Sequence, residues 1–533
     1  MADLLVVEDD RQQMEVRRLI LQQAGHRVEC ATSAREAKDY LCQHQPDLLL
    51  MDLRLPRTED GLELIRHSRQ HAPHTRIVVL SGWTAEFERQ PEHALVDRVV
   101  AKPVRSERLL SILSQLAAFL LLVSVLGAQT YPFQLDAAAE VTAEVEMSAP
   151  GGDWGRSGRE AALATLTLDE EKRFHVMAFA GSSKYIYRVW LGALQPGPHQ
   201  LKIERHPDYS ARGVGLQVFG VTYRQYKPQD PDYAVIANAP AIFARPNTIG
   251  KFTDIPLLMY CERLGDGSLR YSVIFSNEDG GTSTRGLMAR WGRATDIEHV
   301  YQVWPGQQAL PWRAIIQARG HRDVPFQGKL DAQHPLLVVA TDNNMVDFTS
   351  SSAVRYQLAP LIVDLSHTSR EQVMDDHPIT YQIAARELER EGKLRKFGFF
   401  EGEKISHPEN YLHVELRVLN KQTRLAVFVR LEGENLWRSS NLGLPELAIE
   451  RSGWVRTAVE LPPATQPAQV AELAFQCLPE RNFDSNAACR VETVSKLFFL
   501  EASGHPGSNF WRPRLDRPPW VIAPGAMRTV SLR

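Results

Sequence analysis

Acidic, hydroxyl and basic side chains follow four short apolar runs near the start of the chain. Glu8 and Asp9 come directly after one run, while Asp52, Ser81 and Lys102 stand at the ends of three others. If these runs are parallel strands of one open sheet, the side chains should meet, because the carboxyl ends of such strands line the binding crevice. Carboxylates, a hydroxyl and an ammonium group in one place suit phosphoryl transfer to a carboxylate.

The chemistry of each side chain suggests its role in such a transfer. Asp52 would be the nucleophile that accepts the phosphoryl group. Glu8 and Asp9 would supply oxygen ligands for Mg²⁺, which needs only one or two carboxylates besides phosphate oxygens and water. Ser81 would donate its hydroxyl to a phosphate oxygen, and the Lys102 ammonium would act as a point-charge partner.

The sequence around these residues predicts a doubly wound parallel sheet of five strands. Apolar runs without alternation are typical of strands buried on both faces. Such runs cover residues 4–7, 48–51, 77–80 and 99–101, with a weaker one at 27–31. Amphipathic stretches between them predict helices. Strands that alternate with helices over residues 1–117 predict an α/β domain.

Together, the four motifs resemble the receiver domain of two-component response regulators. The matching segments are Leu4-Leu5-Val6-Val7-Glu8-Asp9-Asp10, Met51-Asp52-Leu53-Arg54-Leu55-Pro56, Leu80-Ser81-Gly82 and Ala101-Lys102-Pro103. The resemblance covers about a fifth of the chain. It implies that a histidine kinase or phosphotransfer protein phosphorylates Asp52. It also implies that the backbone carbonyl of Arg54 joins Glu8, Asp9 and Asp52 around Mg²⁺, and that Gly82 leaves the pocket open.

Two features depart from the usual receiver pattern. The loop from Pro56 to Gly61 is one residue longer than the commonest version, and Val99 stands where many receivers have an aromatic residue. In those receivers the aromatic ring swings inward when the hydroxyl residue moves. Its absence leaves phosphorylation possible, but it predicts a weaker conformational output.

A stretch without charged residues runs from Leu109 to Ala128. One interpretation is a membrane helix, since twenty residues suffice to cross the hydrocarbon core. A second is a signal-like segment, because residues 117–126 have the length of a signal-peptide core and small residues follow. A third is that the last receiver helix begins near Ser106 and buries the first part of the stretch against the sheet.

The charges that flank this stretch favour a membrane context. Lys102, Arg105 and Arg108 precede it, and no lysine or arginine follows until Arg156. The positive-inside rule then predicts a cytoplasmic receiver and places residues 129–533 outside the cytoplasm. An internal signal-like segment also suggests a fusion of a receiver with an exported protein.

Beyond Ala128 the pattern predicts mostly-β, sandwich-like domains, so the chain as a whole is multidomain. The predicted units are a receiver-like domain at 1–117, the apolar segment at 109–128, a β-sandwich at 129–225, a β-rich domain with short helices at 226–400, a second sandwich at 401–503 and a Pro/Gly-rich tail at 504–533. We recognise no family in this part of the chain.

The β-rich part carries no catalytic motif, which argues against an enzyme, and its predicted role is to bind carbohydrate or protein. The alternative is a fused polysaccharide-active enzyme. Two polar clusters, at 277–281 and 342–344, could offer oxygen ligands to Ca²⁺, although ordinary turns explain them better. Cys477 and Cys489 could pair if this part is exported. A net charge of −3 gives no indication of a nucleic-acid partner.

Overall fold

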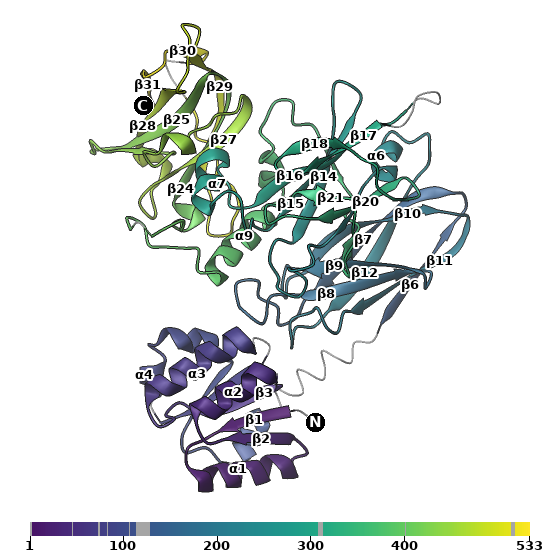
Figure 1. The fold of residues 1–533 in the computed structure, drawn as a ribbon, viewed down its shortest axis with the longest axis vertical. Coiled ribbons are helices and arrows are strands. Elements are labelled where there is room, and N and C mark those ends of the chain that lie inside the picture. Colours follow the sequence, from purple (N-terminus) through teal and green to yellow (C-terminus); the bar gives the residue numbers. More distant parts are fainter. Residues whose placement is uncertain are drawn as a thin grey trace.

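The computed structural model describes residues 3–44, 46–72, 75–82, 84–105, 107–112, 128–306, 313–399, 401–512 and 517–532. Figure 1 shows an N-terminal unit, purple in the sequence colouring, beside a larger β-rich region that runs from blue to yellow. We refer to residues 3–112 as the N-terminal unit and to residues 128–532 as the β-rich region.

The N-terminal unit contains the predicted five-stranded parallel sheet. Its strands are β1 (Asp3–Val7), β2 (Arg27–Ala31), β3 (Leu48–Asp52), β4 (Arg76–Ser81) and β5 (Arg98–Ala101), in the order β2-β1-β3-β4-β5. The helices are α1 (Arg11–Gln23), α2 (Ala34–Gln43), α3 (Thr58–His71) and the short α4 (Thr84–Phe87), followed by the 3-10 turn η1 (Pro91–Leu95). The chain reverses its winding direction between β1 and β3, which is where open α/β sheets form their binding crevice.

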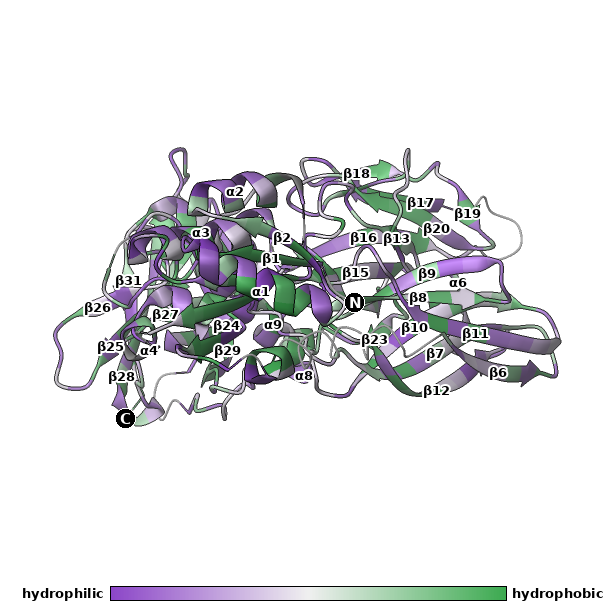
Figure 2. Ribbon diagram, turned by 90° about the horizontal axis from the view of Figure 1, so that it is seen from below, coloured by the Kyte–Doolittle hydropathy of each residue, from purple (hydrophilic) through white to green (hydrophobic). Residues whose placement is uncertain are grey.

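Both faces of this sheet are buried, which explains why its central strands have no alternation. Leu5 and Leu49 pack in one apolar cluster, and Leu4 and Leu48 pack in another on the opposite face. The strands are mostly hydrophobic in Figure 2, whereas hydrophilic residues lie along the helices. Gly61 lets the first turn of α3 approach the sheet, because a Cβ there would lie 2.0 Å from the carbonyl oxygen of Leu53.

The start of the uncharged stretch lies against this sheet. Residues 107–112 are helical. Leu109 is 4% exposed and packs in the same cluster as Leu4, with Leu110 and Ile112 partly buried beside it. Leu109, Leu110 and Ile112 therefore pack on the sheet of the N-terminal unit and are not part of a membrane span. Residues 113–127 lie outside the described residues. None of the helices described is long and apolar enough to cross a membrane.

The β-rich region begins with two sheets packed face to face. One contains β7 (Ala139–Ser148), β10 (Tyr185–Leu194) and β12 (Gln217–Tyr226); the other contains β6 (Gln129–Leu135), β8 (Ala162–Leu168), β9 (Lys172–Ala178) and β11 (Gly197–Arg205). Their inner faces share one apolar cluster. The turn at 195–198 carries the chain from one sheet to the other, since β10 pairs with β7 and β11 pairs with β6 and β8.

The second of these sheets continues beyond the boundary predicted at residue 225. Past β9 it adds β22 (Arg355–Tyr356), β13 (Ala241–Phe243), β20 (His334–Val339) and β19 (Leu330–Asp331), with β21 (Val346–Asp347) paired to β20. Residues 129–225 and 226–400 therefore share a sheet. The alternation that marks each strand carries no information about this pairing.

A six-stranded sheet completes the middle of the chain. Its strands are β18 (Arg322–Pro325), β17 (Arg313–Ala318), β16 (Asp296–Trp304), β15 (Leu269–Phe275), β14 (Pro256–Arg263) and β23 (Leu361–Val363). A turn at 265–267 joins β14 to β15, and Gly267 adopts a positive φ of 80° there. The helices nearby are α6 (Tyr233–Ala237), α7 (Thr284–Trp291), α8 (Gln372–Asp376) and α9 (Ile379–Arg390).

The C-terminal part is a sandwich of two four-stranded sheets around one apolar cluster. One sheet contains β27 (Gly453–Glu460), β24 (Tyr411–Lys421), β29 (Ala488–Phe499) and β30 (Trp520–Ile522); the other contains β26 (Trp437–Ser439), β25 (Thr423–Leu431), β28 (Val470–Pro479) and β31 (Met527–Ser531). The stretch 504–533, predicted as a surface tail, thus supplies an edge strand to each sheet. A Cys477–Cys489 disulfide joins β28 to β29.

Buried charge fastens this sandwich to the rest of the β-rich region. The guanidinium of Arg456, on β27, lies 2.7 Å from Asp375 of α8 and 2.8 Å from Glu415 of β24. His413 lies close by on β24 and stacks on Phe498 with ring centroids 5.0 Å apart. Burial, and then the Arg456 cation, lower the pKa of His413 to about 3, so this imidazole is neutral in the folded protein.

Replacing His413 with phenylalanine should flatten the acid limb of the stability profile. Below pH 6.5 the unfolded chain binds a proton at His413 that the folded chain rejects down to about pH 3. The folded state therefore loses stability as the pH falls through this window. At pH 5 the loss approaches about 2 kcal/mol, at about 1.36 kcal/mol per pH unit. Thermal melts at pH 7.5 and pH 5 should differ less for His413→Phe than for wild type.

The exposed His505 supplies the matched control for this measurement. His505→Gln should keep the wild-type difference between the two melts. An unchanged pH dependence in His413→Phe would show that this imidazole is not the source of the acid sensitivity.

Candidate functional site

The five polar residues predicted to do chemistry gather at the carboxyl edge of the parallel sheet. Glu8 and Asp9 follow β1, Asp52 is the last residue of β3, Ser81 is the last residue of β4 and Lys102 follows β5. Parallel pairing in register brings these strand ends level with one another. The structure therefore brings together the residues that the sequence analysis singled out.

Two cations lie among these carboxylates. Lys102 Nζ is 2.5 Å from Asp52 Oδ2 and 3.4 Å from Glu8 Oε2. Arg17, on the second turn of α1, forms an ion pair with Glu8. Glu8 is almost fully buried, whereas the side chain of Asp52 is 15% exposed. Asp52 is thus an accessible carboxylate with an ammonium group held at one of its oxygens.

The carboxylates also have a spacing that suits a divalent cation. One oxygen from each of Glu8, Asp9 and Asp52 lies within 4.8 Å of the others. Octahedral Mg²⁺ at about 2.0–2.1 Å from its ligands spans oxygen pairs separated by about 3–4 Å. These three residues fit the ion and would hold it. The backbone N–H of Arg54 donates to Asp52 Oδ1 at 3.3 Å. The role of the Arg54 carbonyl stays a prediction.

Neighbouring residues fix the shape of this site. Ser81 is 2% exposed, and its carbonyl accepts a hydrogen bond from the backbone N–H of Lys102 at 2.9 Å. A Cβ on Gly82 would meet nothing within 4 Å, so the sheet edge is open there. Asp10 does not belong to the carboxylate group, because it accepts hydrogen bonds from the backbone N–H groups of Gln12 and Gln13 as the N-cap of α1.

Comparison with known proteins identifies this part of the chain. The family model described as "Response regulator receiver domain" matches residues 4–114. Residues 4–114 are a response regulator receiver domain. Such domains belong to two-component phosphorelay signalling, and we refer to the N-terminal unit as the receiver from here on.

Curated relatives match this chain over part of their length. The virulence transcriptional regulatory protein PhoP of Salmonella typhimurium is 37% identical over 142 residues, which is 26% of this chain and 61% of the relative. The transcriptional regulatory protein PhoP of Escherichia coli O6:H1 is 36% identical over 139 residues, or 25% and 60%. The chain thus spans about three fifths of the length of these relatives.

Solved structures of similar proteins also match about a fifth of the chain. CheY4 of Vibrio cholerae is 28% identical with a TM-score of 0.21, covering 22% of this chain and 98% of that one. The response regulator TrrA of Thermotoga maritima, solved in complex with Mg(2+)-BeF, is 23% identical with a TM-score of 0.20, covering 22% and 99%.

The two polar clusters of the β-rich region lie side by side around an arginine. The backbone N–H of Gly280 donates to the carbonyl of Asp342 at 3.0 Å. The guanidinium of Arg245 pairs with Asp254, Asp279 and Asp342. Arg245 thus supplies, between the two clusters, the positive charge that a Ca²⁺ ion would bring to these carboxylates.

Several buried carboxylates of this region gave no sequence signal. Burial raises the pKa of Asp254 well above its ordinary value and that of Glu387 to about 7. Glu387 accepts a hydrogen bond from the indole N–H of Trp154 at 2.9 Å. Glu387 is on α9 and Trp154 lies far away in the sequence, between β7 and β8. Only the tertiary fold brings them together, so no local spacing could have found the pair.

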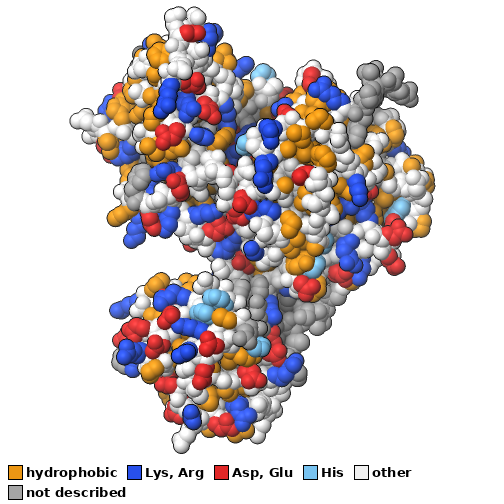
Figure 3. Space-filling view, viewed as in Figure 1, with side chains coloured by type: hydrophobic (Ala, Val, Ile, Leu, Met, Phe, Trp, Pro, Cys, Tyr) orange, Lys and Arg blue, Asp and Glu red, His pale blue; other side chains and the backbone are white. Residues whose placement is uncertain are grey.

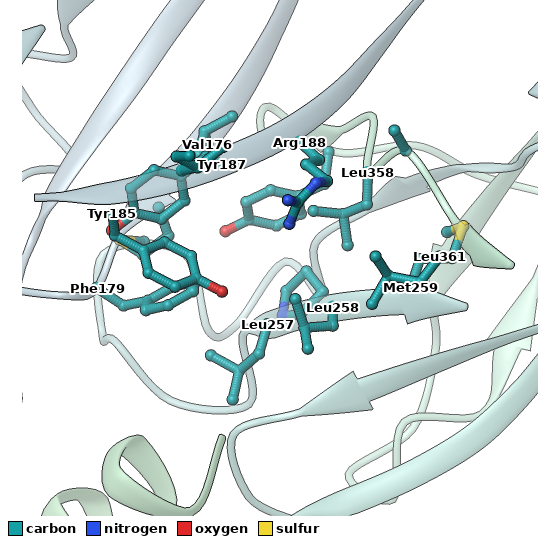
Figure 4. Close-up of a pocket in the computed structure, with 15 residues that line it drawn as sticks. Val176, Phe179, Tyr185, Tyr187, Arg188, Leu257, Leu258, Met259, Leu358 and Leu361 are labelled. Atoms are coloured by element: carbon teal, nitrogen blue, oxygen red, sulfur yellow. The ribbon is translucent and has the colours of Figure 1, made fainter. Parts of the chain in front are cut away.

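The β-rich region also holds a small cavity of about 30 Å³ between β10 and β14. Figure 4 shows Phe179, Tyr185 and Tyr187 on one side of it and Leu257 and Leu258 on the other. The lining is mostly apolar and aromatic, with the charged Arg188 among it, and it includes no carboxylate. This cavity has room for about one or two water molecules, and it offers no carboxylate for hydrolysis.

Asp9→Asn should weaken Mg²⁺ binding by about 10-fold or more, because it removes one carboxylate from a cluster that would hold the ion. Isothermal titration calorimetry with MgCl₂ would measure the change. Asp10→Asn is the matched control, since the adjacent Asp10 carboxylate is used in capping α1 and should leave the affinity within about twofold. Equal losses in both variants would contradict the assignment.

Proposed function

We propose that this protein is a phosphorelay component whose receiver takes a phosphoryl group on Asp52. The donor would be the phosphohistidine of a partner histidine kinase or phosphotransfer protein. The observation that carries the proposal is the gathering of Glu8, Asp9, Asp52 and Lys102 at one sheet edge, with Asp52 the accessible acid that the Lys102 ammonium contacts.

The transfer can be written from the chain's own residues. A carboxylate oxygen of Asp52 attacks phosphorus, the bond from phosphorus to the donor imidazole nitrogen breaks, and the released imidazole takes up a proton. Lys102 then moves its ion pair from Asp52 to a phosphate oxygen, and Ser81 donates its hydroxyl to another. Bound Mg²⁺ would neutralise charge on the phosphoryl group during transfer.

Intact-mass measurement after incubation with a small phosphodonor and MgCl₂ tests this proposal. Wild type should gain one phosphate, and Asp52→Asn should gain none, because the amide is not a nucleophile for phosphorus. Asp39→Asn, which changes an exposed carboxylate on α2, should label like wild type. Labelling of Asp52→Asn at the wild-type level would exclude Asp52 as the acceptor.

The output of phosphorylation should be modest on the β4–β5 face. Val99 pairs with Val79 on β4 and is partly buried, so no aromatic ring is there to swing inward. Hydrogen–deuterium exchange with and without a phosphate mimic should show small changes over residues 84–105. The Val99→Tyr variant should enlarge them. Large protection changes in wild type over that range would contradict the prediction.

In this chain the β-rich region follows the receiver, whereas the part of the PhoP relatives outside the match is about two fifths of their length. Those proteins are named transcriptional regulators. A net charge of −3 supports an output other than DNA binding here. We propose that this region binds a carbohydrate or protein ligand. The cavity in Figure 4 is too small to hold a sugar ring, so such a ligand would bind elsewhere on the region. The alternative, a polysaccharide-active enzyme, requires two carboxyl groups about 5–9.5 Å apart in an open cleft.

The compartment of the β-rich region is a separate proposal. The flanking charges support a cytoplasmic receiver and an exported β-rich region, and the Cys477–Cys489 disulfide also supports export, because disulfides persist in oxidising compartments. The ion pair between Arg159 and Asp97 opposes it, since a bilayer would separate these residues. Protease accessibility of residues 129–533 in intact cells decides between the two arrangements.

A further inference from the structure

Three side chains with nitrogen and sulfur donors meet on the surface of the receiver, away from Asp52. Cys42 is on the last turn of α2, and His67 and His71 lie one turn apart near the end of α3. One donor atom from each lies within 4.8 Å of the other two. Because these helices run back from the carboxyl edge, the cluster lies toward the amino edge of the sheet. It shares no residue with the Glu8–Asp9–Asp52 group.

We propose that Cys42, His67 and His71 form a Zn²⁺ site that joins α2 to α3. Histidines four residues apart on a helix present their rings on the same face. Here the two rings stack with centroids 4.0 Å apart. Thiolate and imidazole are the ligands that zinc prefers, and three protein ligands leave a fourth tetrahedral position for water.

The distances agree with a tetrahedral ion. Zn–S bonds of about 2.3 Å and Zn–N bonds of about 2.0–2.1 Å place sulfur and nitrogen about 3.6 Å apart in such a site. The Cys42 Sγ to His67 Nε2 distance is 3.6 Å. Little rearrangement of this pair is needed to accept the ion.

The surrounding hydrogen bonds favour the required state of the His71 ring, whereas one contact of His67 has to be replaced. His71 Nδ1 lies 3.2 Å from the carbonyl oxygen of His67, so a proton on Nδ1 leaves Nε2 free as a donor to metal. His67 Nε2 also lies 3.3 Å from the carbonyl oxygen of Lys38. That carbonyl lies within α2, where the N–H four residues on already supplies it with a hydrogen bond. Zinc can therefore replace the Lys38 carbonyl as the partner of His67 Nε2 without leaving that carbonyl unpaired.

The exposure of the cluster makes it accessible to metal. Cys42 and His71 are exposed and His67 is half-buried. Figure 3 shows histidine side chains gathered on the receiver face turned to the viewer. The remaining cysteines are placed differently: Cys30 is half-buried, Cys261 is buried, and Cys477 and Cys489 are bonded to each other.

Cobalt substitution in the full-length protein tests the proposal, because a Co²⁺–thiolate bond gives a near-ultraviolet charge-transfer band that carboxylate ligands do not give. Excess MgCl₂ keeps the Glu8–Asp9–Asp52 group occupied during the titration. Wild type should bind one Co²⁺ per chain with this band, and added Zn²⁺ should abolish it. Cys42→Ser should lose the band, and His71→Gln should bind at least about 10-fold more weakly.

Cys30→Ser is the matched control, since it removes the other free cysteine of the receiver and should keep the band. Both substituted ligands Cys42 and His71 are exposed, so circular dichroism should show a wild-type fold. A band of wild-type strength in Cys42→Ser, or binding by wild type without the band, would overturn the proposal.

Discussion

The receiver depends on compensation of the negative charge that its topology concentrates at one edge. Glu8 and Asp52 bring carboxylate oxygens within 4.8 Å of each other. At an effective dielectric constant of about 20, two such charges repel by about 3–4 kcal/mol before solvent screening. Lys102 and Arg17 offset this repulsion, and each comes from a different element of the fold. A phosphoryl group that arrives at Asp52 therefore enters a site in which the cations are already in place.

Buried arginines compensate negative charge in the β-rich region as well. Arg456 is fully buried and contacts Asp375 and Glu415, which come from a helix and a strand distant in the sequence. Arg245 similarly gathers three aspartates. Removing one partner of a buried ion pair typically costs about 3–5 kcal/mol, because the other charge is left without compensation. These pairs hold the segments in one arrangement, whereas apolar contacts alone would tolerate sliding.

The sequence predicts the receiver well because its information is local. Each motif is a strand followed at once by its functional residue, and parallel pairing then brings Asp52 and Lys102 together without further information. In the β-rich region the alternation identifies strands but not their partners. The sheet shared across residue 225 and the edge strands from the predicted tail both depend on pairings distant in the sequence. Likewise, the two polar loops can be recognised as clusters in the sequence. Arg245, which lies between them in the fold, comes about thirty residues before the first loop, so the sequence does not connect it with them.

The contact between the receiver and the β-rich region is at the edge opposite to Asp52. Asp97, at the amino end of β5, pairs with Arg69 and Arg76 of the receiver and also with Arg159 of the β-rich region. The Asp97 carboxylate is 1% exposed. Arg159 of the β-rich region therefore joins a buried group of charges whose other members all belong to the receiver. A change at Asp52 must therefore travel the length of the strands, from the carboxyl edge of the sheet to its amino edge, to reach this contact. Strands buried on both faces are stiff, and Val99 adds no mobile ring to them. The arrangement favours a receiver that presents the Asp52 edge directly to a partner over one that moves the β-rich region.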